Sequence, residues 1–182
     1  HSLFVSNNFA TFDLYKDMMM DLVKKHPEIN FVLKPHPLLP FQIQAREKEG
    51  SISFGQKDYF DYLDKWGSQP NGICITQGDY IKLFKESDCM ITDCGSFIGE
   101  YLPSLHPCIY IFNPRKRKQD EVYTRLAGKI LDTYYVTRTE EELEHAIQEI
   151  IIGGKDSKKE KRRQLLFKEF PNIGNAGKYI CS

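Results

Sequence analysis

The chain has 182 residues, enough for one well-filled hydrophobic core, and its 25 basic and 25 acidic side chains cancel at neutral pH. With balanced charges, the protein has no overall electrostatic attraction to nucleic acid, and nucleic acid is not expected as a partner. Contact with an anionic membrane would need a local basic patch. Hydrophobic residues make up 41% of the chain, and no run approaches the roughly 18 apolar residues of a membrane span, so the composition predicts a soluble globular protein.

The cysteines indicate the cellular compartment of the protein, and the first residues indicate how the chain begins. No pair of the five cysteines has the spacing of a structural zinc site, and Cys74, Cys89 and Cys108 lie inside apolar runs, where a thiol behaves as a small hydrophobe. This indicates a reduced, cytoplasmic setting and argues against a structural zinc site. Neither another metal nor a cofactor is expected. The chain opens without Met or a signal peptide and becomes apolar after two residues, so we expect it to be a piece of a longer protein.

Short apolar runs alternate with helix-periodic stretches in chain order, the pattern of βαβ units around a parallel sheet. Strands are predicted at 3–5, 29–34, 72–76, 89–92, 108–112 and 134–137. Helices are predicted at 11–28, 59–66, 80–87, 97–102, 121–131, 140–152 and 157–170, with Thr139 as the cap of the sixth. The sequence therefore predicts one α/β domain over 1–170, Rossmann-like, with a parallel sheet of about six strands and helices on both faces. A polar tail, 171–182, follows it.

The end of the fourth predicted strand has an unusual composition. Its apolar run stops at Thr92 and Asp93, and a helix-like segment follows after only Cys94, Gly95 and Ser96. In an open parallel sheet, ligands gather at the carboxyl ends of the strands, where the following helices begin. Gly95 would let a ligand approach the backbone and Ser96 offers a hydroxyl, which suits a diphosphate. The spacing alone leaves open a second interpretation, in which Asp93 and Ser96 only cap the helix.

The second predicted strand also ends in polar side chains. Lys34 and His36 leave it with Pro35 and Pro37 on either side of the histidine. Proline restricts its own backbone and that of the residue before it, so the imidazole is held in a rigid exit. A lone histidine is also compatible with a structural or merely exposed position, but this setting equally suits a functional one.

Two further strand ends add candidates at the same rim of the predicted sheet. The third strand ends in Thr76, with Gln77 and Asp79 after it, and the first strand is followed by Ser6 and Asn7. We expect all four polar strand ends to share one rim, because the carboxyl ends of parallel strands lie at one edge.

Two basic stretches are candidates for contact with phosphates. The loop after the fifth strand holds Arg115, Lys116, Arg117 and Lys118. Such a run is most often a solvated surface, and the alternative is contact with phosphates of a donor or of an anionic polymer or lipid acceptor. The stretch 153–163 lacks the spacing of a phosphate loop and has no strand before it, so that function is rejected.

Four segments, in matching order, resemble the CDP-glycerol glycerophosphotransferases, which polymerise or prime teichoic acids. They are KPHP at 34–37, QGDYIKLFKESDCMITDCGSFIGEYL at 77–102, HPCIYIF at 106–112 and TRTEEELEHAI at 137–147. The likeness covers about residues 3–150 and is to the C-terminal, donor-binding half of that family. The wider group of two-domain (GT-B type) glycosyltransferases carries weaker versions of the same pattern.

The resemblance implies roles for individual residues. His36 would be the catalytic residue near the donor diphosphate, Ser96 would hydrogen-bond a phosphate, and Asp93 would orient the turn. Glu100 takes the place of an aspartate in the family motif. The complete predicted donor site consists of Ser6, Asn7, Lys34, Thr76, Asp79, Asp93, Cys94, Gly95, Ser96, Glu100 and Arg115.

The chain also departs from the family motif. Cys94 and Gly95 stand where the family has Tyr and Ser, so one phosphate-binding hydroxyl is missing. An Arg-Gly element that follows the fifth strand in the family has only a doubtful counterpart around Ala127 and Gly128. These departures concern the identity of the donor more than the fold.

The function implied by the resemblance is transfer of a glycerol-phosphate or sugar unit from a nucleotide-diphosphate donor to a polymer or lipid-linked acceptor of the cell envelope. The parent protein would be peripheral at the inner face of the membrane. Its N-terminal acceptor domain, which would supply the catalytic base, is expected to be missing here, so this piece alone should be inactive. Two alternatives remain: a nucleotide-sugar epimerase of the same architecture, and a non-catalytic nucleotide-binding or scaffold domain.

Overall fold

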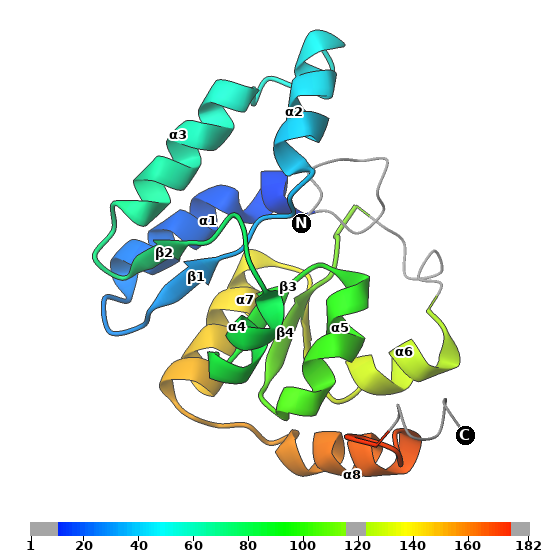
Figure 1. Cartoon of the computed structure of the whole chain (residues 1–182). Coiled ribbons are helices and arrows are strands. Elements are labelled where there is room, and N and C mark those ends of the chain that lie inside the picture. The colour runs from blue at the N-terminus through cyan, green and yellow to red at the C-terminus, as the bar shows by residue number, and fades with distance from the viewer. Residues whose placement is uncertain (1–10, 116–122, 176–182) are drawn as a thin grey trace. The chain divides into compact units, whose positions relative to one another are not determined.

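The computed structural model describes residues 11–115 and 123–175. The chain divides into two compact units, His1–Tyr80 and Ile81–Ser182, where the sequence predicted one domain. Each unit contains helices and a small parallel sheet, so the mixed α/β class is confirmed (Figure 1). The prediction of one sheet of about six strands was wrong: the described strands form a sheet of two and a sheet of three. The predicted strand at 3–5 lies outside the described residues.

Over its described residues, from position 11 on, the first unit packs three helices with two strands. Its elements are α1 (Phe12–Lys25), β1 (Phe31–Leu33), α2 (Leu39–Lys48), α3 (Gln56–Gly67) and β2 (Gly72–Cys74). The strands pair in parallel, with Phe31 opposite Gly72 and Leu33 opposite Cys74. Their carboxyl ends therefore lie at one edge of the sheet.

A tight turn joins α3 to β2 and fixes how the helix covers the sheet. A Cβ atom on Gly72 would lie 2.1 Å from the carbonyl oxygen of Trp66, so only glycine fits. The Trp66 indole donates a 3.3 Å hydrogen bond to the carbonyl of Phe31. The buried Asn71 amide donates to the carbonyls of Val23, His26 and Ile29 at 2.8 to 2.9 Å. These bonds satisfy carbonyls at the end of α1 and after it.

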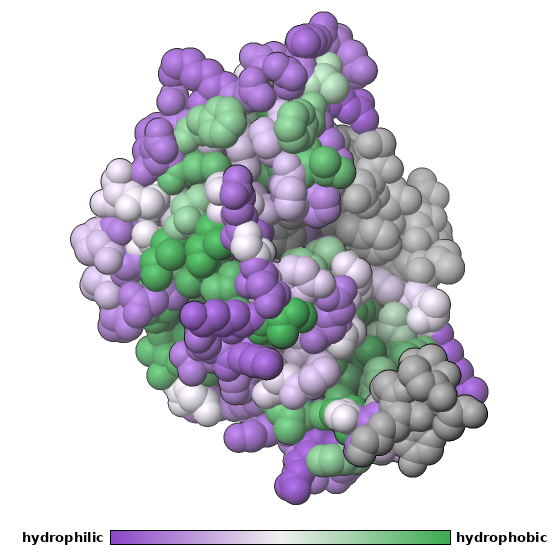
Figure 2. Space-filling view, in the orientation of Figure 1, coloured by the Kyte–Doolittle hydropathy of each residue, from purple (hydrophilic) through white to green (hydrophobic). Residues whose placement is uncertain are grey.

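The opposite face of the two-stranded sheet remains exposed. Val32 and Ile73 stand opposite each other in register and are 43% and 45% exposed. Figure 2 shows hydrophobic residues gathered over the region where Figure 1 draws β1 and β2. The first unit therefore has one apolar surface on its sheet.

The second unit is built on β3 (Met90–Thr92), β4 (Cys108–Ile111) and β5 (Tyr135–Thr137), with β4 in the centre. Its α-helices are α5 (Gly95–Tyr101), α6 (Arg125–Leu131), α7 (Glu140–Ala146) and α8 (Lys159–Glu169). A 3₁₀ turn (Leu102–Ser104) follows α5 and a π-helix (Ile147–Ile152) continues α7. Helix α4 (Tyr80–Glu86) starts at the last residue of the first unit.

Strand β4 is buried along its whole length because helices cover both of its faces. Cys108, Tyr110 and Phe112 alternate along the chain and belong to one apolar cluster with residues of α5, α6 and α8. Ile109 and Ile111 point the other way, toward the face covered by α7 (Figure 1). Helices on both faces were predicted, and the three-stranded sheet has them.

Helix α7 begins at the predicted cap. The Thr139 hydroxyl accepts a 3.2 Å hydrogen bond from the amide of Glu142, and the Glu142 carboxylate accepts one from the amide of Arg138 at 2.6 Å. Each side chain satisfies an amide that the helix leaves without a backbone partner.

Replacing Thr139 by Ala should therefore lower the free energy of unfolding by about 1 kcal/mol. Urea titration followed by circular dichroism measures this change. Thr124→Ala is the matched comparison and should have a similar effect, because the Thr124 hydroxyl caps α6 in the same way, by accepting a hydrogen bond from the amide of Ala127. A Thr139→Ala variant as stable as the unchanged protein would contradict a stabilising cap on α7.

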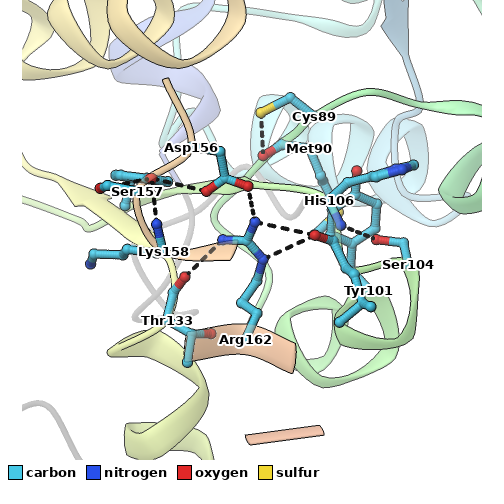
Figure 3. A network of polar contacts seen from close by, with 12 residues as sticks. Cys89, Met90, Tyr101, Ser104, His106, Thr133, Asp156, Ser157, Lys158 and Arg162 are labelled. Atoms are coloured by element: carbon cyan, nitrogen blue, oxygen red, sulfur yellow. Dashed lines mark hydrogen bonds and ion pairs between the residues drawn. The ribbon is translucent and has the colours of Figure 1, made fainter. Parts of the chain in front are cut away.

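A buried arginine ties α8 to the rest of the second unit (Figure 3). Arg162 is fully buried, and its guanidinium donates to the carbonyl of Leu105 at 3.1 and 3.2 Å and to that of Thr133 at 3.1 Å. It also forms an ion pair with Asp156. Leu105 has a positive φ of 60°, so the arginine holds a residue in the left-handed region.

Within the described residues, no helix combines the length and the apolar character needed to cross a bilayer.

Candidate functional site

The predicted site residues lie at the carboxyl edges of two small sheets instead of one continuous rim. Lys34, His36, Thr76 and Asp79 follow β1 and β2 in the first unit, and Asp93 to Ser96 and Arg115 follow β3 and β4 in the second. Within each unit the strands are parallel neighbours, so their ends lie at the same edge. Ser6, Asn7 and the basic residues at 116–118 lie outside the described residues.

His36 lies on the surface directly after β1, in the turn that leads into α2. Its Nδ1 accepts a 3.1 Å hydrogen bond from the amide of Leu38, and its carbonyl accepts one from Leu39 at 2.9 Å. Because Nδ1 is the acceptor, the neutral imidazole carries its proton on Nε2. The ring is thus oriented by its own turn, and Nε2–H can serve as a donor to an anionic oxygen.

The end of β2 adds polar groups beside this turn. Thr76 and Asp79 are exposed. Gly78, between them, has a φ of 91°, a backbone conformation that glycine adopts more easily than other residues. Burial raises the pKa of the Cys74 thiol, and the ammonium group of the half-buried Lys34 partly offsets this increase. The first unit therefore places an ammonium, an imidazole and a threonine hydroxyl after two paired strands.

In the second unit, the turn between β3 and α5 is held by its own side chains. The Thr92 hydroxyl accepts a 3.0 Å hydrogen bond from the amide of Cys94, and the buried Tyr110 hydroxyl donates to the carbonyl of Asp93 at 3.3 Å. Cys94 occupies the N-cap position, and its side chain makes no capping hydrogen bond. The N-cap residue is therefore Cys94, whereas the capping interpretation named Asp93 and Ser96.

The side chains of this turn differ in their access to solvent. Asp93 is buried, whereas Ser96 is exposed and its hydroxyl lies 3.3 Å from the Cys94 sulfur. A Cβ atom on Gly95 would meet no atom within 4 Å, so the backbone there is open to approach. Glu100 is exposed on α5, one turn beyond Ser96.

The neighbouring strand ends contribute two positively charged groups. Arg115 is exposed, and its amide donates to the Asn113 side-chain oxygen at 3.0 Å. Arg138 follows β5, and its guanidinium carbon lies 3.9 Å from the centroid of the Phe112 ring, a stacked cation–π arrangement. The edge of the three-stranded sheet thus combines a serine hydroxyl with two guanidinium groups, which suits an anionic ligand.

Sequence reasoning missed Arg138, although a signal was present. The residue directly follows a strand of a parallel sheet, as Lys34 does, but the segment was interpreted only as a helix cap and as part of the family likeness, and Arg138 was not named as a site residue. It also missed Phe60 and Asp64, which were assigned to a helix without a function. Among the described residues, no three His, Cys, Asp or Glu side chains gather in the way that metal ligands do.

The fold and these two edges define a protein of the mixed α/β class with polar, partly cationic strand ends. No family model, no curated protein and no solved structure matches the chain.

Proposed function

We propose that this chain is the donor-binding part of a transferase that moves a glycerol-phosphate or sugar unit from a nucleotide diphosphate to a polymer or lipid-linked acceptor of the cell envelope. The observation that carries the proposal is the turn after β3, which combines an exposed Ser96 hydroxyl, open backbone at Gly95 and a buried, anchored Asp93. The sequence likeness described above supports the kind of donor.

In this proposal, an acceptor hydroxyl attacks the phosphorus or the sugar carbon next to the diphosphate, and the nucleotide leaves with the bonding electrons. The protein stabilises the negative charge that develops on the leaving phosphate. In the second unit, Ser96 donates a hydrogen bond to a phosphate oxygen. In the first unit, His36 can donate to an anionic oxygen through Nε2–H, since its Nδ1 already accepts from Leu38. The base that takes the proton of the acceptor hydroxyl would come from a part of the protein outside this chain.

Donor binding can be tested on the chain itself by thermal unfolding in the presence of CDP-glycerol, CDP-ribitol and several UDP-sugars. A ligand that binds only the folded state raises the free energy of unfolding, by about 2.7 kcal/mol at a hundred times its Kd. We expect one nucleotide class to stabilise the chain. No stabilisation by any of them would contradict the proposal.

The roles of the two proposed phosphate donors can be tested by single substitutions. Ser96→Ala and His36→Ala should each weaken donor binding by roughly tenfold or more, because each removes a hydrogen bond to a charged group. Calorimetric titration measures the effect. Ser51→Ala and His145→Ala alter exposed residues outside the proposed site and should bind as the unchanged chain does.

Gly95, in place of the serine of the family motif, supports a second candidate function, a nucleotide-binding domain without catalysis. In the parent protein, His36→Ala would abolish turnover of an enzyme but leave the partner of a scaffold bound. An epimerase of the same architecture would instead be revealed by the nucleotide that stabilises the chain.

A further inference from the structure

A hollow of about 500 Å³ lies between α3 and β2, within the first unit. The helix contributes Phe60, Leu63, Asp64 and Gly67, which are spaced by three and four residues and so share one helical face. Cys74 and Thr76 line the other side; they stand two residues apart at the end of the strand. Thr76 is also one of the predicted donor-site residues.

The helical wall of the hollow offers a flat apolar surface. The Phe60 ring is 49% exposed, and it packs edge-on against the buried Tyr59 ring, with 5.3 Å between the centroids. This contact orients the Phe60 ring while leaving much of its surface accessible. Gly67 has no side chain, and a Cβ atom there would meet nothing within 4 Å, so the space beside the ring stays open.

One charged group lies next to this surface. Asp64 follows Phe60 by four residues on the same helix, is exposed, and has no ion-pair partner among the described residues. The other polar residues that line the hollow, Ser68, Cys74 and Thr76, are uncharged; burial raises the pKa of the Cys74 thiol, with the Asp64 carboxylate adding to the effect. The hollow therefore combines an aromatic wall with a single carboxylate acceptor.

We propose that this hollow binds the base of the nucleotide, with the base stacked on Phe60 and its exocyclic amino group donating to the Asp64 carboxylate. The inference rests on the proposed function and names the part of the donor that this site would take. Its place supports it, because Thr76 lines the hollow and β1, which pairs with β2, leads directly to Lys34 and His36. A carboxylate accepts from the amine of cytosine or adenine, whereas uracil has none, so amine-bearing bases are preferred.

Calorimetric titration of the whole chain with CDP, ADP and UDP tests the inference. Phe60→Ala should weaken binding of the preferred nucleotide by at least about fivefold, the effect of losing one stack between a base and an aromatic ring. Gly67→Leu should abolish binding by filling the hollow. Gly128→Leu is its matched control and should bind normally, because Gly128 lies on α6, outside the hollow, and a Cβ atom there also meets no atom within 4 Å. Asp64→Asn should bring the affinity for UDP close to that for the preferred nucleotide.

Each result either supports or overturns the inference. If Phe60→Ala and Gly67→Leu bind as the unchanged chain does while Ser96→Ala binds weakly, the base lies elsewhere, and the proposed function survives without this site. A preference for UDP, or a selectivity unaffected by Asp64→Asn, overturns the role of the carboxylate. If no nucleotide binds the unchanged chain, the inference and the proposed function fail together. Circular dichroism melting curves identify any variant that is not folded.

Discussion

Arg162→Met should lower the free energy of unfolding by about 3 to 5 kcal/mol, the largest effect that we expect from a single substitution in the second unit. The methionine fills similar space but removes every donor. The carbonyls of Leu105 and Thr133 and the carboxylate of Asp156 would then lose a partner inside the protein. Urea unfolding followed by circular dichroism measures the change.

Arg163→Met is the matched control for this substitution. Arg163 is the next residue of α8, its side chain is 62% exposed, and its ion pair with Glu160 is 4.0 Å long. Exposed pairs of this kind contribute between zero and about 1 kcal/mol, so this variant should be nearly as stable as the unchanged protein. Equal stability of the two variants would show that the buried network contributes little.

Gly72→Ala should destabilise the first unit by about 3 kcal/mol, at the upper end of the usual cost of overpacking. The added methyl group would meet the backbone carbonyl of Trp66 at 2.1 Å, so the turn between α3 and β2 has to move. Trp66 is the only tryptophan of the chain, is buried in this unit and bonds to β1, so its fluorescence reports unfolding there directly.

Gly67→Ala provides the comparison for Gly72→Ala, because the same methyl group at the end of α3 meets no atom within 4 Å. Alanine is also the better helix former, so this variant should be as stable as the unchanged protein or slightly more so. A Gly72→Ala variant that retains the Trp66 unfolding midpoint would contradict the steric argument.

The strands were largely predictable because each is a short apolar run. Strand β4 was expected at 108–112 and extends from Cys108 to Ile111, and β2 begins at Gly72 as expected. Their assembly into sheets was not predictable from such runs. An apolar run shows that a strand is buried but not which strand it pairs with, so five described strands were assigned to one sheet where the structure has two.

Helix α2 was missed for a physical reason. Its apolar residues do not fall on one side, since Leu39 and Ile43 are buried while Phe41 is exposed. Pro40 lies in the first turn of the helix, where proline is tolerated because its missing amide would have no partner. Helix α3 was predicted closely, because its buried residues recur with helical spacing.

The candidate site was predictable at the strand ends and not elsewhere. His36 and Ser96 stand out because a polar residue after an apolar run is visible in the sequence. Phe60 and Asp64 gain significance only from the hollow that β2 completes, and two residues of a helix carry no sign of such a partner. Arg162 belongs to a strongly charged stretch that suggests a solvated helix, and nothing in the sequence separates the buried arginine from its exposed neighbours.

The Tyr110 hydroxyl bond to the carbonyl of Asp93 has a consequence for function. Tyr110 is enclosed by the apolar interior of the second unit, yet its oxygen supports the loop that carries Ser96 from beneath. Interior repacking that tilts this ring would therefore shift the loop without touching a ligand. Natural variation in affinity could consequently arise from residues deep in the protein, well away from any molecule that binds.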